Sequence, residues 1–171
     1  IAFWNAEAFM WQQKIEKEKR ELIRRELVFL ESGNNLDLGC GSYSYIKSVG
    51  FDFSEKMLKF NDNCSEKVVG NLEEKLPFDN FRFDSVTAVF VFNYVNNYEF
   101  LLLEVKRILK QNGDFVMVLG NVNDWQKQKE VNSFDFVEWE KVLKKVGFNV
   151  EFYEKEGLGF FRCINMLKSR N

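Results

Sequence analysis

Apolar positions along this chain follow two alternating patterns, and the alternation predicts a layered α/β fold. Short apolar runs rich in β-formers predict buried strands, and segments with apolar residues at three- and four-residue spacing predict helices. The expected strands cover residues 35–38, 50–52, 67–69, 83–90, 115–119, 148–153 and 160–167. The expected helices cover residues 14–30, 43–48, 55–60, 99–110 and 136–146. Strands and helices alternate up to residue 118, so we expect one sheet with helices on both faces.

A glycine-rich turn follows the first expected strand. The strand Asn35–Leu38 carries Asp37 near its end, and the turn is Gly39-Cys40-Gly41. Glycine lacks a Cβ, so two glycines let the backbone bend sharply and come close to a ligand. Residues 42–46 are expected to open a helix whose free N–H groups face that ligand. An acid beside those amides suits a ligand that also carries an ammonium group.

Composition narrows the class of protein. The chain has 171 residues, which suggests a single domain over 1–171, and 46% of them are hydrophobic, enough for a substantial core. The net charge is −2, so the overall charge gives no footprint for nucleic acid or for an anionic membrane. No apolar run approaches the roughly 20 residues of a membrane span.

The chain has no histidine and three dispersed cysteines. The absence of histidine excludes Ser-His-Asp and Cys-His catalysis. The dispersed cysteines give no sign of a disulfide framework or a zinc cluster. We expect no metal. In the turn, Cys40 is expected to serve as a small packing residue. No signal peptide is visible, although the chain begins with Ile1, and a reducing cytoplasmic compartment is the expectation.

Two stretches in order resemble motifs of a known family. Leu36–Gly41, LDLGCG, resembles the first motif of the class I S-adenosylmethionine-dependent methyltransferases, in the form common in the ubiquinone/menaquinone-type and methyltransferase type-11-like branch. Gly50–Leu58 resembles the second motif, G-x-D-x-S-x-x-M-L, in which the acid binds both ribose hydroxyls. A carboxylate has two acceptor oxygens for the two donors of a diol, so Asp52 suits that role.

Three later stretches continue the resemblance. Gly70–Phe78 is similar to the family's G-D-A-x-x-L-P-F, with Asn71 in place of the acid near the adenine amine. Phe83–Val86 resembles the F-D-x-V strand, and Leu103–Leu119 resembles the family's next helix and strand, in which Glu104 and Arg107 support each other. Several motifs in the right order strengthen the assignment beyond any one of them.

The resemblance implies a Rossmann-like seven-stranded mixed sheet of order 3-2-1-4-5-7-6, with only the last strand antiparallel. It implies S-adenosylmethionine as cofactor and in-line methyl transfer to a small-molecule acceptor. Three residues are candidates for acid–base work by location alone, namely Tyr45, Tyr94 and Asp124. The implied cofactor-binding residues are Asp37, Gly39, Cys40, Gly41, Asp52, Phe53, Met57, Asn71, Leu72, Val89 and Phe90.

Some features depart from the family pattern and leave alternatives open. Tyr43 stands where a third glycine is usual, and few residues separate Asp37 from Asp52. These departures, with Asn71, favour a catalytically silent cofactor-binding or partner-binding protein as the alternative. A nicotinamide-dependent oxidoreductase is a weaker rival, because Ser44 replaces the last glycine of its G-x-G-x-x-G fingerprint.

The expected core covers residues 35–167. The role of the residues before it stays open between two interpretations. Residues 1–11 contain four large aromatic side chains, and residues 1–31 lead directly into the first strand. The aromatic segment either packs the leading helix onto the sheet or forms a lid that borders the cofactor pocket.

Overall fold

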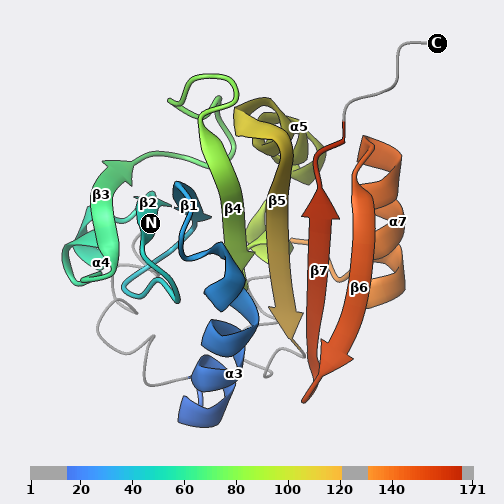
Figure 1. Ribbon diagram of the computed structural model, residues 1–171, viewed down its shortest axis with the longest axis horizontal. Coiled ribbons are helices and arrows are strands. Elements are labelled where there is room, and N and C mark those ends of the chain that lie inside the picture. The colour runs from blue at the N-terminus through green and yellow to red at the C-terminus, as the bar shows by residue number, and fades with distance from the viewer. Residues whose placement is uncertain (1–14, 121–130, 167–171) are drawn as a thin grey trace.

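The computed structural model describes residues 15–120 and 131–166, which form one sheet with helices on its faces (Figure 1). The sheet has seven strands in the order β3-β2-β1-β4-β5-β7-β6, which confirms the predicted topology. The strands are β1 (Asn35–Leu38), β2 (Ser48–Asp52), β3 (Cys64–Val69), β4 (Phe83–Val89), β5 (Leu109–Gly120), β6 (Asn149–Lys155) and β7 (Leu158–Ile164). The helices are α3 (Lys17–Leu27), α4 (Glu55–Lys59), α5 (Tyr98–Ile108) and α7 (Phe136–Val146), with short 3₁₀ turns η1 (Val28–Leu30) and η2 (Phe92–Tyr94).

Strand direction also agrees with the prediction. Neighbouring strands from β3 to β5 pair in parallel, and β7 runs antiparallel between β5 and β6. The turn between β6 and β7 is Glu156-Gly157, and both residues have positive φ angles, 51° and 74°. Two such residues form the tight turn whose twist matches that of a hairpin. The hairpin therefore places β7 beside β5 and leaves β6 at the sheet edge.

Alternating side chains of β5 build two hydrophobic cores. Val116 and Val118 face α3, where they pack with Leu22, Ile23 and Leu27. Phe115 and Met117 face the opposite side, where α5 and α7 contribute the rest of the larger core. The two helix layers confirm that the sheet is covered on both faces (Figure 1).

Side-chain caps explain where three helices begin. The Ser54 side chain accepts a hydrogen bond from Met57 N at the start of α4, and Asn97 does the same for Phe100 N at the start of α5. Asp135 and Glu138 form a capping box on α7, and Gly147 ends that helix with φ 98°. Such caps supply partners for backbone groups that a helix end leaves without one.

The helix expected over residues 43–48 is absent, so that prediction was wrong. Residues 39–47 form an irregular loop between β1 and β2, although parallel strands are usually joined by a dozen or more residues. Asn61 and Asn63 stabilise the loop instead. Asn61 accepts from Ser44 N at 3.2 Å and donates to Gly41 O at 3.2 Å, and Asn63 donates to Ser44 O at 2.6 Å. These contacts replace the backbone bonds of a helix.

Two strand starts differ from the prediction by three residues or more, whereas the other starts differ by two residues at most. β5 begins at Leu109, directly after α5, whereas the strand was expected at residue 115. Asn112 has φ 59° and the β4–β5 register shifts between Phe83 and Ser85, so Asn112-Gly113 forms an irregularity inside β5 and does not terminate the helix. β3 begins at Cys64 and is longer than expected. The aromatic segment 1–11 and Asp124 lie outside the described residues.

Candidate functional site

A cleft of about 550 Å³ lies where β1, β2 and β4 end. In open α/β sheets, ligands bind at the carboxyl ends of the strands. Four segments line this cleft, namely the glycine turn after β1, the end of β2 with the start of α4, the turn after β3, and the segment after β4. The lining residues are Gly39, Gly41, Asp52, Phe53, Met57, Asn71, Leu72, Glu73, Glu74, Val89, Phe90, Val91, Tyr94 and Val95.

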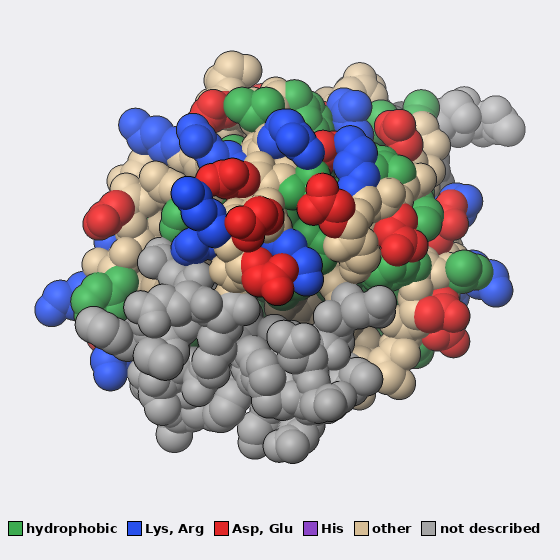
Figure 2. Space-filling view, turned by 90° about the horizontal axis from the view of Figure 1, so that it is seen from below, with side chains coloured by type: hydrophobic (Ala, Val, Ile, Leu, Met, Phe, Trp, Pro, Cys, Tyr) green, Lys and Arg blue, Asp and Glu red, His purple; other side chains and the backbone are tan. Residues whose placement is uncertain are grey.

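Figure 2 views the molecule from the side at which β4 and β5 end. Lys, Arg, Asp and Glu side chains are mixed over the coloured part of this face. This mixture of signs does not form the basic stripe that a nucleic-acid backbone requires.

The glycine turn gives the cleft an open backbone wall. Gly39 and Gly41 have φ angles of 61° and 55°, a region that other L-residues rarely adopt. The Gly39 N–H donates to Phe51 O at 2.7 Å, which ties the turn to β2. A Cβ on Gly39 would lie 2.7 Å from Val91 Cγ2, so a side chain at this position would clash inside the cleft. The turn therefore depends on glycine both for its conformation and for space.

Asp52 is the acid best placed for a diol. It ends β2 and lies in the cleft wall with 5% of its surface exposed. Its Oδ2 accepts from Gly41 N at 2.9 Å and its Oδ1 accepts from Ser54 N at 2.8 Å. A backbone hydrogen bond from Phe53 adds a third donor, and a carboxylate has about four acceptor sites, so acceptor capacity remains for a ligand. Burial raises the pKa of Asp52, and the backbone hydrogen bonds oppose that rise.

Asp37 has a different environment, with fewer donors around its carboxylate. It is buried near the end of β1, and Thr87 Oγ1 donates to its Oδ1 at 2.8 Å. Burial raises the pKa of Asp37 to about 6, since desolvation penalises the charged form. A cationic group placed beside Asp37 would lower this pKa and stabilise the carboxylate, which agrees with the ammonium partner expected from the sequence.

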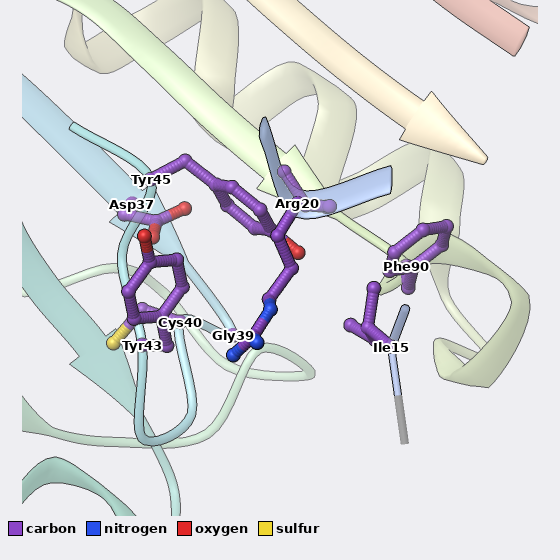
Figure 3. Close-up of a pocket in the computed structure, with 9 residues that line it drawn as sticks. Ile15, Arg20, Asp37, Gly39, Cys40, Tyr43, Tyr45 and Phe90 are labelled. Carbon is purple, nitrogen blue, oxygen red and sulfur yellow. The ribbon is translucent and has the colours of Figure 1, made fainter. Parts of the chain in front are cut away.

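A second, smaller cavity of about 20 Å³ lies between α3 and the ends of β1 and β4, next to the cleft. Figure 3 shows Asp37 and Tyr43 on one side of it, the Tyr45 ring between them and Arg20 in this view, and the Arg20 side chain extending from α3 toward Gly39. The space itself has room for little more than a water molecule, but the acid and the guanidinium on its walls carry charges that complement an ammonium and a carboxylate. Arg20 could not be predicted as a site residue from the sequence, because nothing in the chain order places α3 beside the glycine turn.

Val89 and Phe90 line both spaces, so the cleft and the smaller cavity share a wall. Phe90 has φ 58°, an uncommon value for an aromatic residue, and its N–H donates to Val118 O at 2.9 Å. Such backbone strain is often kept at functional sites. Tyr43, the departure from a third glycine, packs edge-on against Tyr45 with ring centroids 5.1 Å apart and lines the smaller cavity, not the cleft.

The turn after β3 places Leu72 and Asn71 at the cleft, but the Asn71 amide has partners within its own turn. Its Oδ1 accepts from Glu73 N at 3.0 Å and its Nδ2 donates to Glu74 Oε1 at 3.3 Å. The Glu73 carboxylate accepts from Asn96 N at 2.7 Å and Asn97 N at 3.0 Å, which joins this turn to the start of α5. The Asn71 side chain therefore shapes the turn, and Leu72 presents its apolar side chain to the cleft.

The residues expected as candidates for acid–base catalysis lie in different parts of the chain and of the site. Tyr94 lines the cleft, whereas Tyr45 is buried at the smaller cavity. Burial raises the pKa of the Tyr45 phenol above its usual range, so this phenol keeps its proton at neutral pH. Asp124 lies outside the described residues and receives no structural account.

Residues 15–120 and 131–166 contain neither a candidate metal site nor a membrane-spanning helix. These residues contain no group of three or more His, Cys, Asp or Glu side chains that could hold a metal ion. No helix within them is long and apolar enough to cross a membrane.

The described residues fit S-adenosylmethionine in three respects. The glycine turn leaves space that a Cβ would fill, Asp52 offers two acceptor oxygens, and Asp37 lies opposite Arg20 as needed for an amino acid end. The apolar walls formed by Phe53, Met57 and Leu72 suit a flat base.

Comparison with known proteins identifies the family. A family model described as "Methyltransferase domain" matches residues 36–117. The chain is 31% identical over 175 residues to an uncharacterized protein of Methanocaldococcus jannaschii, an alignment that covers 78% of this chain and 68% of that protein. It is 26% identical to the Caenorhabditis elegans sterol 4-C-methyltransferase strm-1, covering 69% of this chain and 41% of that enzyme.

A solved structure has the same fold over almost its whole length. It is described as a complex between the Haloferax volcanii Trm112 methyltransferase activator and the putative methyltransferase. The TM-score is 0.78 at 18% identity, covering 96% of this chain and 98% of that chain. This likeness and the sheet order show the fold. The matched methyltransferase domain and the relative of 31% identity give the family: the chain belongs to the class I S-adenosylmethionine-dependent methyltransferases, and its cofactor is S-adenosylmethionine.

Proposed function

We propose that the protein transfers a methyl group from S-adenosylmethionine to a small-molecule acceptor by in-line displacement. The observation that carries this proposal is the pair of hydrogen bonds that fixes Asp52 between the glycine turn and the start of α4, at the wall of the cleft. A preformed acceptor pair of this kind selects a diol without any rearrangement of the protein.

Each end of the cofactor then has a proposed partner. Asp52 would accept from the ribose hydroxyls, and Leu72 with Phe53 and Met57 would hold the adenine. Asp37 and Arg20 would bind the ammonium and the carboxylate at the smaller cavity. The cofactor supplies an electrophilic methyl group on a sulfonium, so the chain's residues are needed to orient the reactants and exclude water.

The acceptor side is proposed to lie along the segment after β4. Phe90, Val91 and Val95 give this part of the cleft an apolar surface, with Tyr94 as its polar group. We propose an acceptor with a flat or apolar body and one nucleophilic atom. Where that atom carries a proton, Tyr94 is the preferred candidate to receive it or to orient it, since the Tyr45 phenol is buried away from the cleft.

Isotope transfer tests the function. The protein is incubated with S-adenosylmethionine carrying a labelled methyl group and with fractionated small-molecule extracts, and mass spectrometry identifies any labelled product. We expect one fraction to gain the label and S-adenosylhomocysteine to accumulate in proportion. The Tyr94→Phe variant serves as a matched test of the acceptor side, with slower turnover and unchanged cofactor binding expected.

Dependence on a partner protein is the second candidate. The related fold in Haloferax volcanii was solved with a methyltransferase activator. If the chain binds cofactor without turnover, we propose that it lacks a partner protein and that its site is not catalytically silent. Adding such an activator to the labelled assay separates the two cases, because a silent protein stays inactive with the activator present.

A further inference from the structure

Two thiols far apart in the sequence converge on one glycine of the sheet. Cys40 belongs to the glycine turn, Cys64 begins β3, and Gly50 lies in β2 between them. A Cβ on Gly50 would lie 2.3 Å from Cys64 Sγ and 3.0 Å from Cys40 Sγ. Both sulfurs therefore lie within 3.0 Å of a single point, in space that any side chain at position 50 would fill.

The surroundings give the two thiols different characters. Cys64 is partly exposed, whereas Cys40 is buried with its Sγ 3.7 Å from Gly41 O. Contact with the Cys40 thiol lowers the pKa of Cys64, whereas contact with Cys64 and burial raise the pKa of Cys40. Ser44 Oγ lies 3.6 Å from Cys64 Sγ, and this contact also lowers the pKa of Cys64. Because Cys64 is the more exposed of the two thiols and the thiolate is the reactive form, Cys64 is the sulfur that reacts with an oxidant first.

We propose that Cys40 and Cys64 form a reversible modification site, at which a peroxide oxidises Cys64 and Cys40 then closes a disulfide beside Gly50. In the first step, the Cys64 thiolate attacks a peroxide oxygen. An S–O bond forms, the O–O bond breaks, and the leaving oxygen departs as hydroxide. In the second step, the Cys40 sulfur loses its proton and attacks the Cys64 sulfur. The S–S bond forms, the S–O bond breaks, and water leaves. The peroxide is reduced, two thiols are oxidised, and a dithiol reductant reverses the change.

The disulfide would act on the cofactor site, a consequence that rests on the proposed function. Cys40 lies between Gly39 and Gly41, and the Gly41 N–H donates to Asp52. Drawing Cys40 toward Cys64 displaces the turn and with it the contact that orients Asp52. Oxidation should therefore weaken cofactor binding, and bound cofactor should disfavour the disulfide at equilibrium by the same factor.

Peptide mapping tests the chemical step without any cofactor. The full chain is treated with hydrogen peroxide, the remaining thiols are alkylated, and the digest is analysed by mass spectrometry. We expect a Cys40–Cys64 link that dithiothreitol removes. The Cys163→Ser variant is the matched control, because Cys163 is buried in β7 and burial raises its pKa, so the link should still form. Cys40→Ser should stop at a sulfenic acid on Cys64 that dimedone traps. No link in the parent chain would overturn the proposal.

Calorimetry with S-adenosylhomocysteine tests the coupling. We expect the oxidised parent protein to bind about tenfold more weakly than the reduced protein and to recover on reduction. Peroxide-treated Cys64→Ser should keep the affinity of the reduced protein. A mapped disulfide with unchanged affinity would overturn the coupling. If the reduced parent protein does not bind S-adenosylhomocysteine, the proposed function fails, and the peptide map still decides whether the thiol site exists.

Discussion

Asp52 Oδ2 accepts a hydrogen bond from the backbone N–H of Gly41 at 2.9 Å, so the acid that ends β2 is fixed to the glycine turn that follows β1. The two family motifs are therefore one structural unit, although Ser44 and the rest of a loop separate them in the chain. Any change that moves the turn also moves the carboxylate, and this coupling underlies the predictions about the cofactor site.

Replacing Gly39 with alanine should destabilise the protein by about 2 kcal/mol or more, because the new side chain adopts a left-handed conformation and meets Val91. Gly157→Ala is the matched control. Gly157 has φ 74°, but a Cβ at this position would meet no heavy atom within 4 Å, so only the backbone strain of about 1 kcal/mol applies. Urea denaturation of both variants measures the difference, and equal losses would contradict the steric account of the turn.

Arg107→Ala should cost about 3 kcal/mol of stability. Arg107 donates to both oxygens of Glu104, at 2.8 and 2.7 Å, and to Phe78 O at 2.7 Å. Glu104 is only 7% exposed, and removing Arg107 takes away the cation that its carboxylate contacts directly. This geometry confirms the mutual support of Glu104 and Arg107 expected from the sequence.

Lys110→Ala provides the control for that variant, because Lys110 forms an ion pair with Asp84 in which both side chains are exposed. Exposed pairs contribute at most about 1 kcal/mol. Chemical denaturation should rank the two variants clearly, and a loss from Lys110→Ala as large as that from Arg107→Ala would argue against the buried network.

Asp37 should make the ligand-free protein less stable as the pH rises from about 4 to about 6. Burial raises the pKa of Asp37 from 3.8 to about 6, so within this window the unfolded chain has lost a proton that the folded protein still holds. Stability therefore falls as pH rises through the window and levels off above it, by about 3 kcal/mol from this group. Burial shifts the pKa of Asp52 in the same direction, so the comparison must be made against Asp37→Asn. Denaturation at several pH values should show a smaller fall in that variant, and identical curves would contradict the prediction.

Local sequence signals predicted much of the fold. The bounds of α7 were predicted correctly because its capping residue Asp135 and its terminating Gly147 are adjacent to it in the chain. The loop between β1 and β2 was not, because Asn61 and Asn63, which stabilise it, come from beyond β2 and α4. The conformation of a short segment often depends on such distant partners. Local sequence patterns do not predict those contacts.

The same distinction between local signals and distant packing holds for the residues of the candidate site. Asp37 and Asp52 could be located because each acid lies at a strand end, where parallel strands share one edge. Arg20 could not, since its place depends on how α3 packs across the sheet. Asn71 was located at the cleft, but its amide partners Glu73 and Glu74 were visible only in the structure.

Calorimetric titration with S-adenosylhomocysteine, the stable product, tests the central claim most directly. The parent protein should bind, and Asp52→Ala should lose on the order of 1.5–3 kcal/mol, or roughly tenfold to a hundredfold in affinity. Asp52→Asn should lose less, because one acceptor oxygen remains. Asp84→Ala should bind like the parent, since Asp84 lies near the start of β4, at the opposite end of that strand from the cleft. Absence of binding by the parent protein, or unchanged binding by Asp52→Ala, would contradict the proposed cofactor site.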